Sequence, residues 1–298
     1  MLSIIIPSRK EIFLNHTIRD VLKNATQEIE VFPVLDGYEP DELIEDPRVT
    51  YIRLPEAKHT QKRHGINKAV EMSNGKFVMS LDAHCMVAPG FDEVLTRDCK
   101  EENWVMIPRR QRLDAENWCI EKDERPPIDY EYIIFSSLIK DRSIHGFRWD
   151  ARTIERMDIP MENTLEFQGS AWLTRKTWFN KIGLMAQLDG EMDGYRGWGA
   201  EAEEVSFKTY KAGGEVKTDK NTFYCHWHKG KSGRGYWMSR QESRMSYAYA
   251  FNKWVIEERD FFISLIEKFA PLPQWPSNWK DKIYKLGRNP LNLNIGEL

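Results

Sequence analysis

The stretch that decides the fold is Phe77-Val78-Met79-Ser80-Leu81-Asp82-Ala83-His84-Cys85. Its first five residues predict a short buried strand, which ends abruptly at an acid and an imidazole. Residues i and i+2 of an extended chain point the same way, so Asp82 and His84 could hold one cation. A carboxylate with an imidazole suits Mn²⁺ or a similar divalent ion better than Ca²⁺, which prefers oxygen ligands. The alternative is that Asp82 caps the next turn and that His84 is satisfied by its neighbours.

Predicted strands and helices alternate before and around this stretch. Their order is strand 2–6, helix 11–24, strand 31–35, strand 49–54 and helix 60–73. Such alternation predicts an α/β fold with a mostly parallel sheet, whose ligands bind outside the carboxyl ends of the strands. Asp36 and Asp82 both stand at such ends.

The second half of the sequence is less regular. A strand-like run ends at Pro108, and the irregular residues that follow are expected to carry the acceptor substrate. A helix is predicted over residues 201–211, and a longer one from about Ser239 to Ala270, with apolar residues at helical spacing on one face.

Two further histidines, His226 and His228, precede the run Lys229-Gly-Lys-Ser-Gly-Arg-Gly235. A metal ligand followed by a flexible basic loop suits a diphosphate, since the cation and Lys or Arg side chains neutralise phosphate oxygens. Lys229 and Arg234 are the candidates for these contacts. The alternative is one exposed and one buried histidine without a ligand.

Glycines and acids are combined in Gly197-Trp198-Gly199-Ala200-Glu201-Ala202-Glu203-Glu204. Acids in a first helical turn interact favourably with the helix dipole, which accounts for at least one of the three. A carboxylate presented there could also orient a sugar hydroxyl or act as a base. We therefore take Glu201, Glu203 and Trp198 as candidate catalytic residues.

Composition excludes several classes of protein. The 298 residues are 41% hydrophobic and 30% charged, as in ordinary globular proteins. Apolar runs are far shorter than the roughly 20 residues of a membrane span, and residues 1–30 lack a signal-peptide pattern. Four irregularly spaced cysteines predict reduced thiols rather than a disulfide framework, so we expect a cytoplasmic protein.

Charge is distributed unevenly, since residues 229–298 are net basic and residues 1–228 net acidic. The segment Lys229–Lys253 combines arginines with aromatic residues, which would suit a polyanion. The alternatives are a lid that closes over a bound donor and a solvated helix face.

Taken together and in this order, these motifs resemble a GT-A glycosyltransferase of the family 2 type, and they most resemble the catalytic domain of the polypeptide N-acetylgalactosaminyltransferases. Leu81-Asp82-Ala83-His84-Cys85 is similar to that family's Leu-Asp-Ser-His-Cys metal motif. Trp198-Gly-Ala-Glu201, followed by Glu204-Val-Ser-Phe207, is similar to its Trp-Gly-Gly-Glu-Asn and Glu-(Ile/Leu)-Ser-Phe motifs.

The resemblance implies a divalent cation, Mn²⁺ or another such as Mg²⁺, held by Asp82, His84 and His226, with His228 as the fallback. It implies a nucleoside diphosphate sugar as donor, with UDP preferred, and Asp36 as the acid that reads the base. Together with Lys229 and Arg234 of the basic loop, the predicted donor-binding residues are Pro7, Arg9, Glu11, Asp36, Asn67, Asp82 and Gly169.

Several departures from the family's pattern bear on the chemistry. In inverting relatives an aspartate follows the glutamate that matches Glu201, but here the residue is Ala202, which cannot accept a proton. This agrees with the retaining chemistry of the resembling family, although Glu203 or Asp193 could supply a base from a shifted position. The sequence also shows neither the lectin module, the membrane anchor nor the cysteine pattern of the animal enzymes, so we expect an acceptor other than a mucin-type peptide.

The organisation predicted is a GT-A catalytic domain of residues 1–235, with a nucleotide-sugar-binding half (1–108) and an acceptor half (109–235), and a helical extension of residues 236–298. The function predicted is metal-dependent sugar transfer, with a hydroxymethylated base in DNA as one acceptor and a saccharide, lipid-linked or protein acceptor as the alternative. A silent domain that binds a sugar nucleotide or nucleic acid is the alternative of another class. The presence of Asp82, His84 and His226 favours the enzyme.

Overall fold

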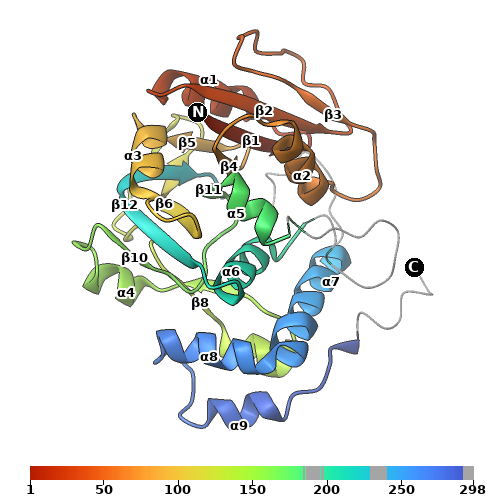
Figure 1. Cartoon of the computed structure of the whole chain (residues 1–298), viewed down its shortest axis with the longest axis vertical. Coiled ribbons are helices and arrows are strands. Elements are labelled where there is room, and N and C mark those ends of the chain that lie inside the picture. Colours follow the sequence, from red (N-terminus) through yellow and green to blue (C-terminus); the bar gives the residue numbers. More distant parts are fainter. Residues whose placement is uncertain (184, 186–194, 196–197, 229–239, 291–298) are drawn as a thin grey trace.

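A mixed β-sheet forms the centre of the molecule and carries helices on both faces (Figure 1). The structure is a computed structural model that describes residues 1–183, 185, 195, 198–228 and 240–290, without the side chains of residues 240–242. The main path of the sheet has the strand order β10-β12-β6-β11-β4-β1-β2-β3. Neighbours β4, β1, β2 and β3 are parallel, as are β6 and β12, whereas β11 is antiparallel to both β4 and β6. The α/β fold expected from the sequence is confirmed.

The strands are β1 (Leu2–Ser8), β2 (Ile29–Asp36), β3 (Ile52–Leu54), β4 (Phe77–Leu81), β5 (Cys85–Val87), β6 (Trp104–Asp114), β7 (Cys119–Ile120), β8 (Glu131–Ile133), β9 (Gly146–Arg148), β10 (Met161–Asn163), β11 (Ala171–Arg175) and β12 (Glu215–His226). The α-helices are α1 (Leu14–Asn24), α2 (Lys62–Met72), α3 (Phe91–Asp98), α4 (Asp150–Glu155), α5 (Lys176–Lys181), α6 (Glu201–Lys211), α7 (Arg240–Ala250), α8 (Arg259–Phe269) and α9 (Trp279–Tyr284). Two π-helical segments are η1 (Ser137–Asp141) and η2 (Phe251–Glu257).

Alternate residues of the central strands face different helix layers. Leu2 and Ile4 of β1 belong to an apolar cluster with α1 and α3. Ile5 belongs to the cluster on the other face, with α2, α5 and α6. Because successive side chains of a strand point to opposite faces, burial on both sides explains why β1 is an unbroken apolar run.

Two strands continue through prolines at which the sequence predicts their ends. β1 passes through Pro7, which lies beyond the residues Leu2–Ile5 that pair with β4. β6 passes through Pro108, which lies beside the register shift that follows Asp219 in β12. A proline removes only its own N–H bond, so each strand tolerates one where a neighbour no longer pairs or where a bulge interrupts the ladder.

The prediction of one long C-terminal helix from about Ser239 to Ala270 is wrong. It is divided into α7, η2 and α8, and Glu258 leaves the helical conformation between the last two, with φ −107° and ψ 36°. The apolar face predicted for α8 is buried as expected. The break allows η2 and α8 both to pack on one apolar cluster, which also contains Tyr132 of β8 and Phe207 of α6.

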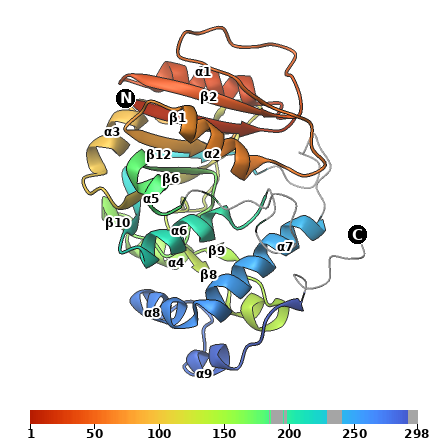
Figure 2. The same ribbon diagram turned by 45° about the vertical axis from the view of Figure 1, so that its right-hand side comes forward.

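The C-terminal helices α8 and α9 lie at the opposite end of the molecule from β1, β2 and β3 in both views (Figure 2). The apolar cluster to which they belong contains buried residues from Tyr132 onward and none of the first three strands. None of the helices in the described part of the chain is long and apolar enough to cross a membrane.

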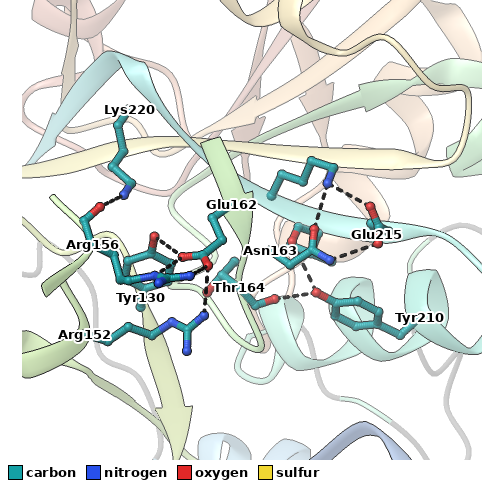
Figure 3. Close-up of polar contacts among 11 residues, drawn as sticks. Tyr130, Arg152, Arg156, Glu162, Asn163, Thr164, Tyr210, Glu215 and Lys220 are labelled. Carbon is teal, nitrogen blue, oxygen red and sulfur yellow. Dashed lines mark hydrogen bonds and ion pairs between the residues drawn. The ribbon is translucent and has the colours of Figure 1, made fainter. Parts of the chain in front are cut away.

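A polar network fastens the edge strand β10 to its neighbours (Figure 3). Glu162 accepts hydrogen bonds from the Tyr130 hydroxyl at 2.7 Å and from Nε of Arg156 at 3.2 Å. Asn163 donates to Glu215 of β12 at 2.9 Å, and the Tyr210 hydroxyl of α6 donates to the Thr164 carbonyl at 2.6 Å. The segment around β10 is therefore held to the sheet by directional hydrogen bonds as well as by the β10–β12 ladder.

Candidate functional site

A cleft opens at the carboxyl ends of β1, β2 and β4, which is where ligands bind in sheets of this kind. Its floor and walls include five of the residues predicted for the donor. The lining residues are Pro7, Ser8, Arg9, Glu11, Val34, Asp36, Thr60, Gln61, Lys62, Asp82, His84, Gln168, Trp198, His226, Trp227 and His228.

One end of the cleft is organised around Asp36, the last residue of β2. Its carboxylate accepts hydrogen bonds from Arg9 at 3.1 Å, from the Gln61 backbone N–H at 2.9 Å and from the Gln61 amide at 2.8 Å. Arg9 also donates to the carbonyls of Ala57 and His59, each at 2.7 Å. These bonds fix Asp36 and the loop before α2 as one rigid wall, with an acid that can accept a donor N–H from a planar base.

The other end holds a cluster of one carboxylate and two imidazoles. Asp82 follows β4, His84 lies two residues on, and His226 ends β12. The Nε2 atoms of the two histidines are 3.1 Å apart, and Oδ2 of Asp82 is 3.6 Å from Nε2 of His226. Within the described chain, one ligand atom from each of the three lies within 4.8 Å of the others. β5, antiparallel to β12, brings His84 and His226 together across the ladder.

The charge state of this cluster suits a cation. Burial by itself would raise the pKa of Asp82, but Lys62, whose Nζ is 2.8 Å from Oδ1, and the two imidazoles together lower it. Burial lowers the pKa of His226 well below its usual range, against the opposing effect of Asp82. Asp82 is therefore ionised and His226 is neutral at pH 7, which are the forms that bind metal ions.

The spacing of the donor atoms also fits a divalent ion. Two ligands at right angles on an ion with bonds of about 2.1 Å lie about 3 Å apart. Nδ1 of His84 and Nδ1 of His226 are both buried and have no hydrogen-bond partner among the described residues. A carboxylate oxygen of Glu11 lies 3.5 Å from Nδ1 of His84, close to where a second-layer acid orients a metal-binding imidazole. The residues present thus fit a divalent ion such as Mn²⁺.

A tight turn presents Glu201 and Trp198 beside this cluster. Gly199 has φ 100° and Ala200 has φ 58°, so the chain is left-handed immediately before α6. The Gly199 N–H donates to Glu201 at 3.0 Å, and its carbonyl accepts a bond from Arg63 at 2.7 Å. Arg63 is fully buried and also pairs with Glu204. The buried guanidinium of Arg63 therefore holds the turn through the Gly199 carbonyl, and the Gly199 N–H in turn holds the Glu201 carboxylate.

A second cavity continues from the cleft and is strongly acidic. It shares Lys62, Asp82, Gln168 and Trp198 with the first. Its own carboxylates are those of Glu131, Glu166, Glu201 and Glu203.

Protonation is unusual in this acidic cavity. Burial, followed by the charges of Glu201 and Glu131, raises the pKa of Glu203 to about 8. Burial and the charges of Glu203 and Glu131 raise the pKa of Glu166 well above its usual range. Carboxyls with raised pKa values in a cleft are candidates for proton transfer.

The remaining predicted residues are placed as follows. Gly169 lines the acidic cavity, with ordinary van der Waals room for a Cβ beside Glu201. Asn67 lies on α2 outside the residues that line either cavity, and its amide exchanges hydrogen bonds with the Met185 backbone at 2.7 and 3.0 Å. His228 lines the cleft, and burial with the charges of Arg110 and Arg112 lowers its pKa to about 4. Lys229, Arg234 and Asp193 lie outside the described residues.

Several site residues escape prediction from the sequence. Lys62 and Gln61 come from the first turn of α2 and the residue before it, and no local motif distinguishes them from solvated polar residues. Glu166 and Gln168 fall in an irregular stretch between β10 and β11, where only the folded chain brings them to the cleft. No local motif marks Arg63 either.

A mostly parallel sheet with an Asp-His-His cluster at its carboxyl edge is the arrangement that the resemblance to a GT-A glycosyltransferase predicts. Residues 3–183 match the family model described as Glycosyl transferase family 2, and the chain belongs to this family.

Individual relatives agree with this family. The chain is 26% identical over 168 residues to the Drosophila melanogaster protein named "Putative polypeptide N-acetylgalactosaminyltransferase 13", an alignment that covers 53% of the chain and 26% of that protein. It is similar to the crystal structure of GalNAc-T7 with UDP, GalNAc and Mn²⁺, with a TM-score of 0.67, 18% identity and coverage of 95% of this chain and 53% of that one.

A second solved structure shares the fold. It is that of S. aureus TarS 1-349 in complex with UDP-GlcNAc, with a TM-score of 0.52, 10% identity and coverage of 94% of this chain and 79% of that one. At these identities the structures establish the fold and not the substrate. The chain spans about a quarter of the Drosophila relative and about half of the GalNAc-T7 chain.

Proposed function

We propose that this chain is a metal-dependent glycosyltransferase that moves a sugar from a nucleoside diphosphate sugar, preferably UDP-linked, to an acceptor hydroxyl. The observation that carries the proposal is the cluster of Asp82, His84 and His226 at the end of the cleft that meets the acidic cavity. A polar wall that suits a nucleobase lies on one side of the cluster, and the acidic cavity lies on the other.

The donor would lie along the cleft with its base at Asp36 and its diphosphate at the cluster. Asp36, held by Arg9 and Gln61, would accept a hydrogen bond from the base. A bound Mn²⁺ would neutralise the departing diphosphate as a Lewis acid. Lys62 lies within bonding distance of Asp82 and adds a positive charge at the same place.

The acceptor hydroxyl would enter the acidic cavity. Glu201, held by its bond to the Gly199 N–H, would orient the sugar or the acceptor. We propose a retaining outcome, in which the donor's own phosphate assists the acceptor, since Ala202 stands where inverting relatives have their base. Glu203 is the alternative base from the neighbouring position, because its pKa of about 8 lets its conjugate base form near neutral pH.

For the acceptor we propose a hydroxymethylated base in DNA, on the basis of the basic and aromatic segment Lys229–Lys253. The first part of this segment lies outside the described residues. We also propose that the chain works in the cytoplasm, because its four cysteines are free thiols, three of them buried. The division into residues 1–235 and 236–298 is part of the same proposal.

The test is release of free sugar from a panel of nucleoside diphosphate sugars, by slow transfer to water, with Mn²⁺ and with a chelator. Release from one donor that needs Mn²⁺ and is lost in Asp82→Ala would support the enzyme. Donor binding without release, and without transfer to any hydroxyl acceptor, would instead support the silent binding domain. Exposed Asp41→Ala is the matched control, since it removes a carboxylate outside the lining of both cavities.

A further inference from the structure

A third cavity, rich in arginine, adjoins the donor cleft and the acidic cavity. Arg110 and Arg112 of β6 line it together with Arg125 and Arg148. It shares Gln168 and His228 with the donor cleft, and Glu131, Gly146 and Gln168 with the acidic cavity. A ligand in this cavity would therefore reach the place where the acceptor hydroxyl is expected.

Two of these arginines are buried and have N–H groups that no described residue accepts. Arg110 and Arg112 are each 6% exposed. Arg110 gives one N–H to Glu131 at 2.7 Å, and Arg112 gives one to the Pro126 carbonyl at 2.9 Å. Nε and Nη1 of Arg110 and Nη2 of Arg112 have no acceptor among the described residues. Buried charged donors without acceptors are costly, so this arrangement is expected where a ligand supplies the acceptors.

The carboxylates nearby do not accept these N–H bonds, since Oδ1 of Asp123 lies 4.0 Å from Nη1 of Arg112, beyond hydrogen-bond distance. Arg125 is paired with Glu121 and Asp123, and Arg148 lies 3.1 Å from Asp150. Burial and the positive charges of Arg125, Arg148 and Arg110 lower the pKa of Arg112, an effect that an anion in the cavity would reverse. Guanidinium forks of this kind match the oxygens of a phosphate group.

The cavity is placed on the acceptor side of the metal cluster. Arg112 is the register partner of His226 on the neighbouring strand, so the arginines begin one strand away from the predicted metal ligand. Asp36 and Gln61, which form the nucleobase wall, do not line it. At its mouth the ring of Phe147 is 49% exposed, with the Arg148 guanidinium 5.9 Å from its centroid. An exposed aromatic ring beside an arginine is a surface on which a nucleobase stacks.

We propose that the arginine cavity binds a phosphodiester of a single-stranded nucleic-acid acceptor, with the adjoining base stacked on Phe147 and the target hydroxyl directed into the acidic cavity. This inference rests on the proposed function for the identity of the target hydroxyl only. Binding of the strand can be measured without any transfer.

The experiment measures binding of a fluorescein-labelled oligothymidylate by anisotropy, at several salt concentrations, to the wild type, Arg112→Gln and Phe147→Ala. We expect Arg112→Gln to bind at least about tenfold more weakly, with the slope of log affinity against log salt reduced by about 0.7 for the lost phosphate contact. Arg125→Gln, at a side chain that is 47% exposed, gives a second variant with the core intact. Arg97→Gln on α3 is the matched control and should bind as the wild type does.

An abasic phosphodiester strand of the same length separates phosphate from base. We expect it to bind more weakly than oligothymidylate, and Phe147→Ala to remove the difference. Equal binding of the two strands by the wild type would overturn the nucleic-acid assignment in favour of another phosphodiester polymer. Unchanged binding in both Arg112→Gln and Arg125→Gln would overturn the site.

Donor binding distinguishes the remaining possibility, that the arginines serve the donor diphosphate. Calorimetry with UDP and Mn²⁺ should give the same affinity for the wild type and Arg112→Gln, and a tenfold loss in the variant would overturn the acceptor assignment. Failure of the wild type to bind any nucleotide, with arginine-dependent strand binding retained, would refute the proposed function and leave the arginine site standing.

Discussion

The raised pKa of Glu203 has a direct consequence for stability. Glu203 is buried among Glu131, Glu166 and Glu201 in the acidic cavity, and burial raises its pKa to about 8 from the ordinary value of 4.5 for a glutamate. Between these two values the folded state holds a proton on Glu203 that the unfolded state has released. The free energy of unfolding therefore falls as pH rises through this window. Glu203→Gln keeps the shape of the protonated side chain and removes this contribution.

The size of the effect follows from the window. Each pH unit between the two pKa values is worth about 1.36 kcal/mol, so between pH 5 and pH 7 the wild type should lose about 2.7 kcal/mol more than Glu203→Gln. pH 5 lies half a unit above the lower end of this window and pH 7 one unit below its upper end, so the loss approaches this value from below. Burial is the largest cause of the raised pKa of Glu166 and is present in both proteins, so the contribution of Glu166 differs little between them.

The assay is urea unfolding of the wild type and Glu203→Gln at pH 5, 6 and 7, in the presence of a chelator so that metal binding makes no contribution. Glu45→Gln, at an exposed position, is the matched control and should follow the wild type. Stabilities of the wild type and Glu203→Gln that change in parallel across this range would refute the assignment of a buried proton to Glu203.

Three further predictions concern the other parts of the site. Asp82→Ala and His226→Ala should each abolish Mn²⁺-dependent donor binding in calorimetry while circular dichroism shows the fold intact, and near-normal binding in both would contradict the metal assignment. Gly199→Ala should lower the free energy of unfolding by about 1–3 kcal/mol, because φ is 100° and a Cβ would lie 3.3 Å from the Ser246 Cβ; urea unfolding against the open position Gly287→Ala checks this, and equal stabilities would contradict it. Asp36→Asn should weaken UDP binding about tenfold, since it replaces a charged acceptor held by Arg9 with a neutral one, and an unchanged affinity would show that the base lies elsewhere.

The fold was predictable because its signals are local. Strand β4 has the bounds that the sequence predicts, and all of its residues are buried. Such an apolar run can be recognised as a central strand without long-range information. The errors come from tertiary context. Pro7 and Pro108 are tolerated because of where neighbouring strands stop pairing, and the break at Glu258 follows from packing of η2 and α8 on a shared cluster.

The candidate site likewise has a part that the sequence predicts and a part that depends on tertiary structure. Asp82, His84 and His226 stand at strand ends, where the topology of the sheet gathers side chains, and the structure brings the three together. Their role as metal ligands stays a prediction. The acidic and arginine cavities combine residues from separate irregular segments, such as Glu131, Glu166 and Glu203. No periodicity relates such residues along the chain, so their shared environment and their raised pKa values emerge only from the folded structure.

We propose that the Asp-His-His cluster holds a nucleotide sugar through a divalent cation. Calorimetric titration of the wild type with UDP-sugars, in Mn²⁺ and again in excess chelator, tests this proposal. We expect micromolar or tighter binding of at least one donor in Mn²⁺ and a loss of at least about tenfold in chelator. Donor binding of equal strength in both conditions would contradict it, because the cluster would then have no part in holding the diphosphate.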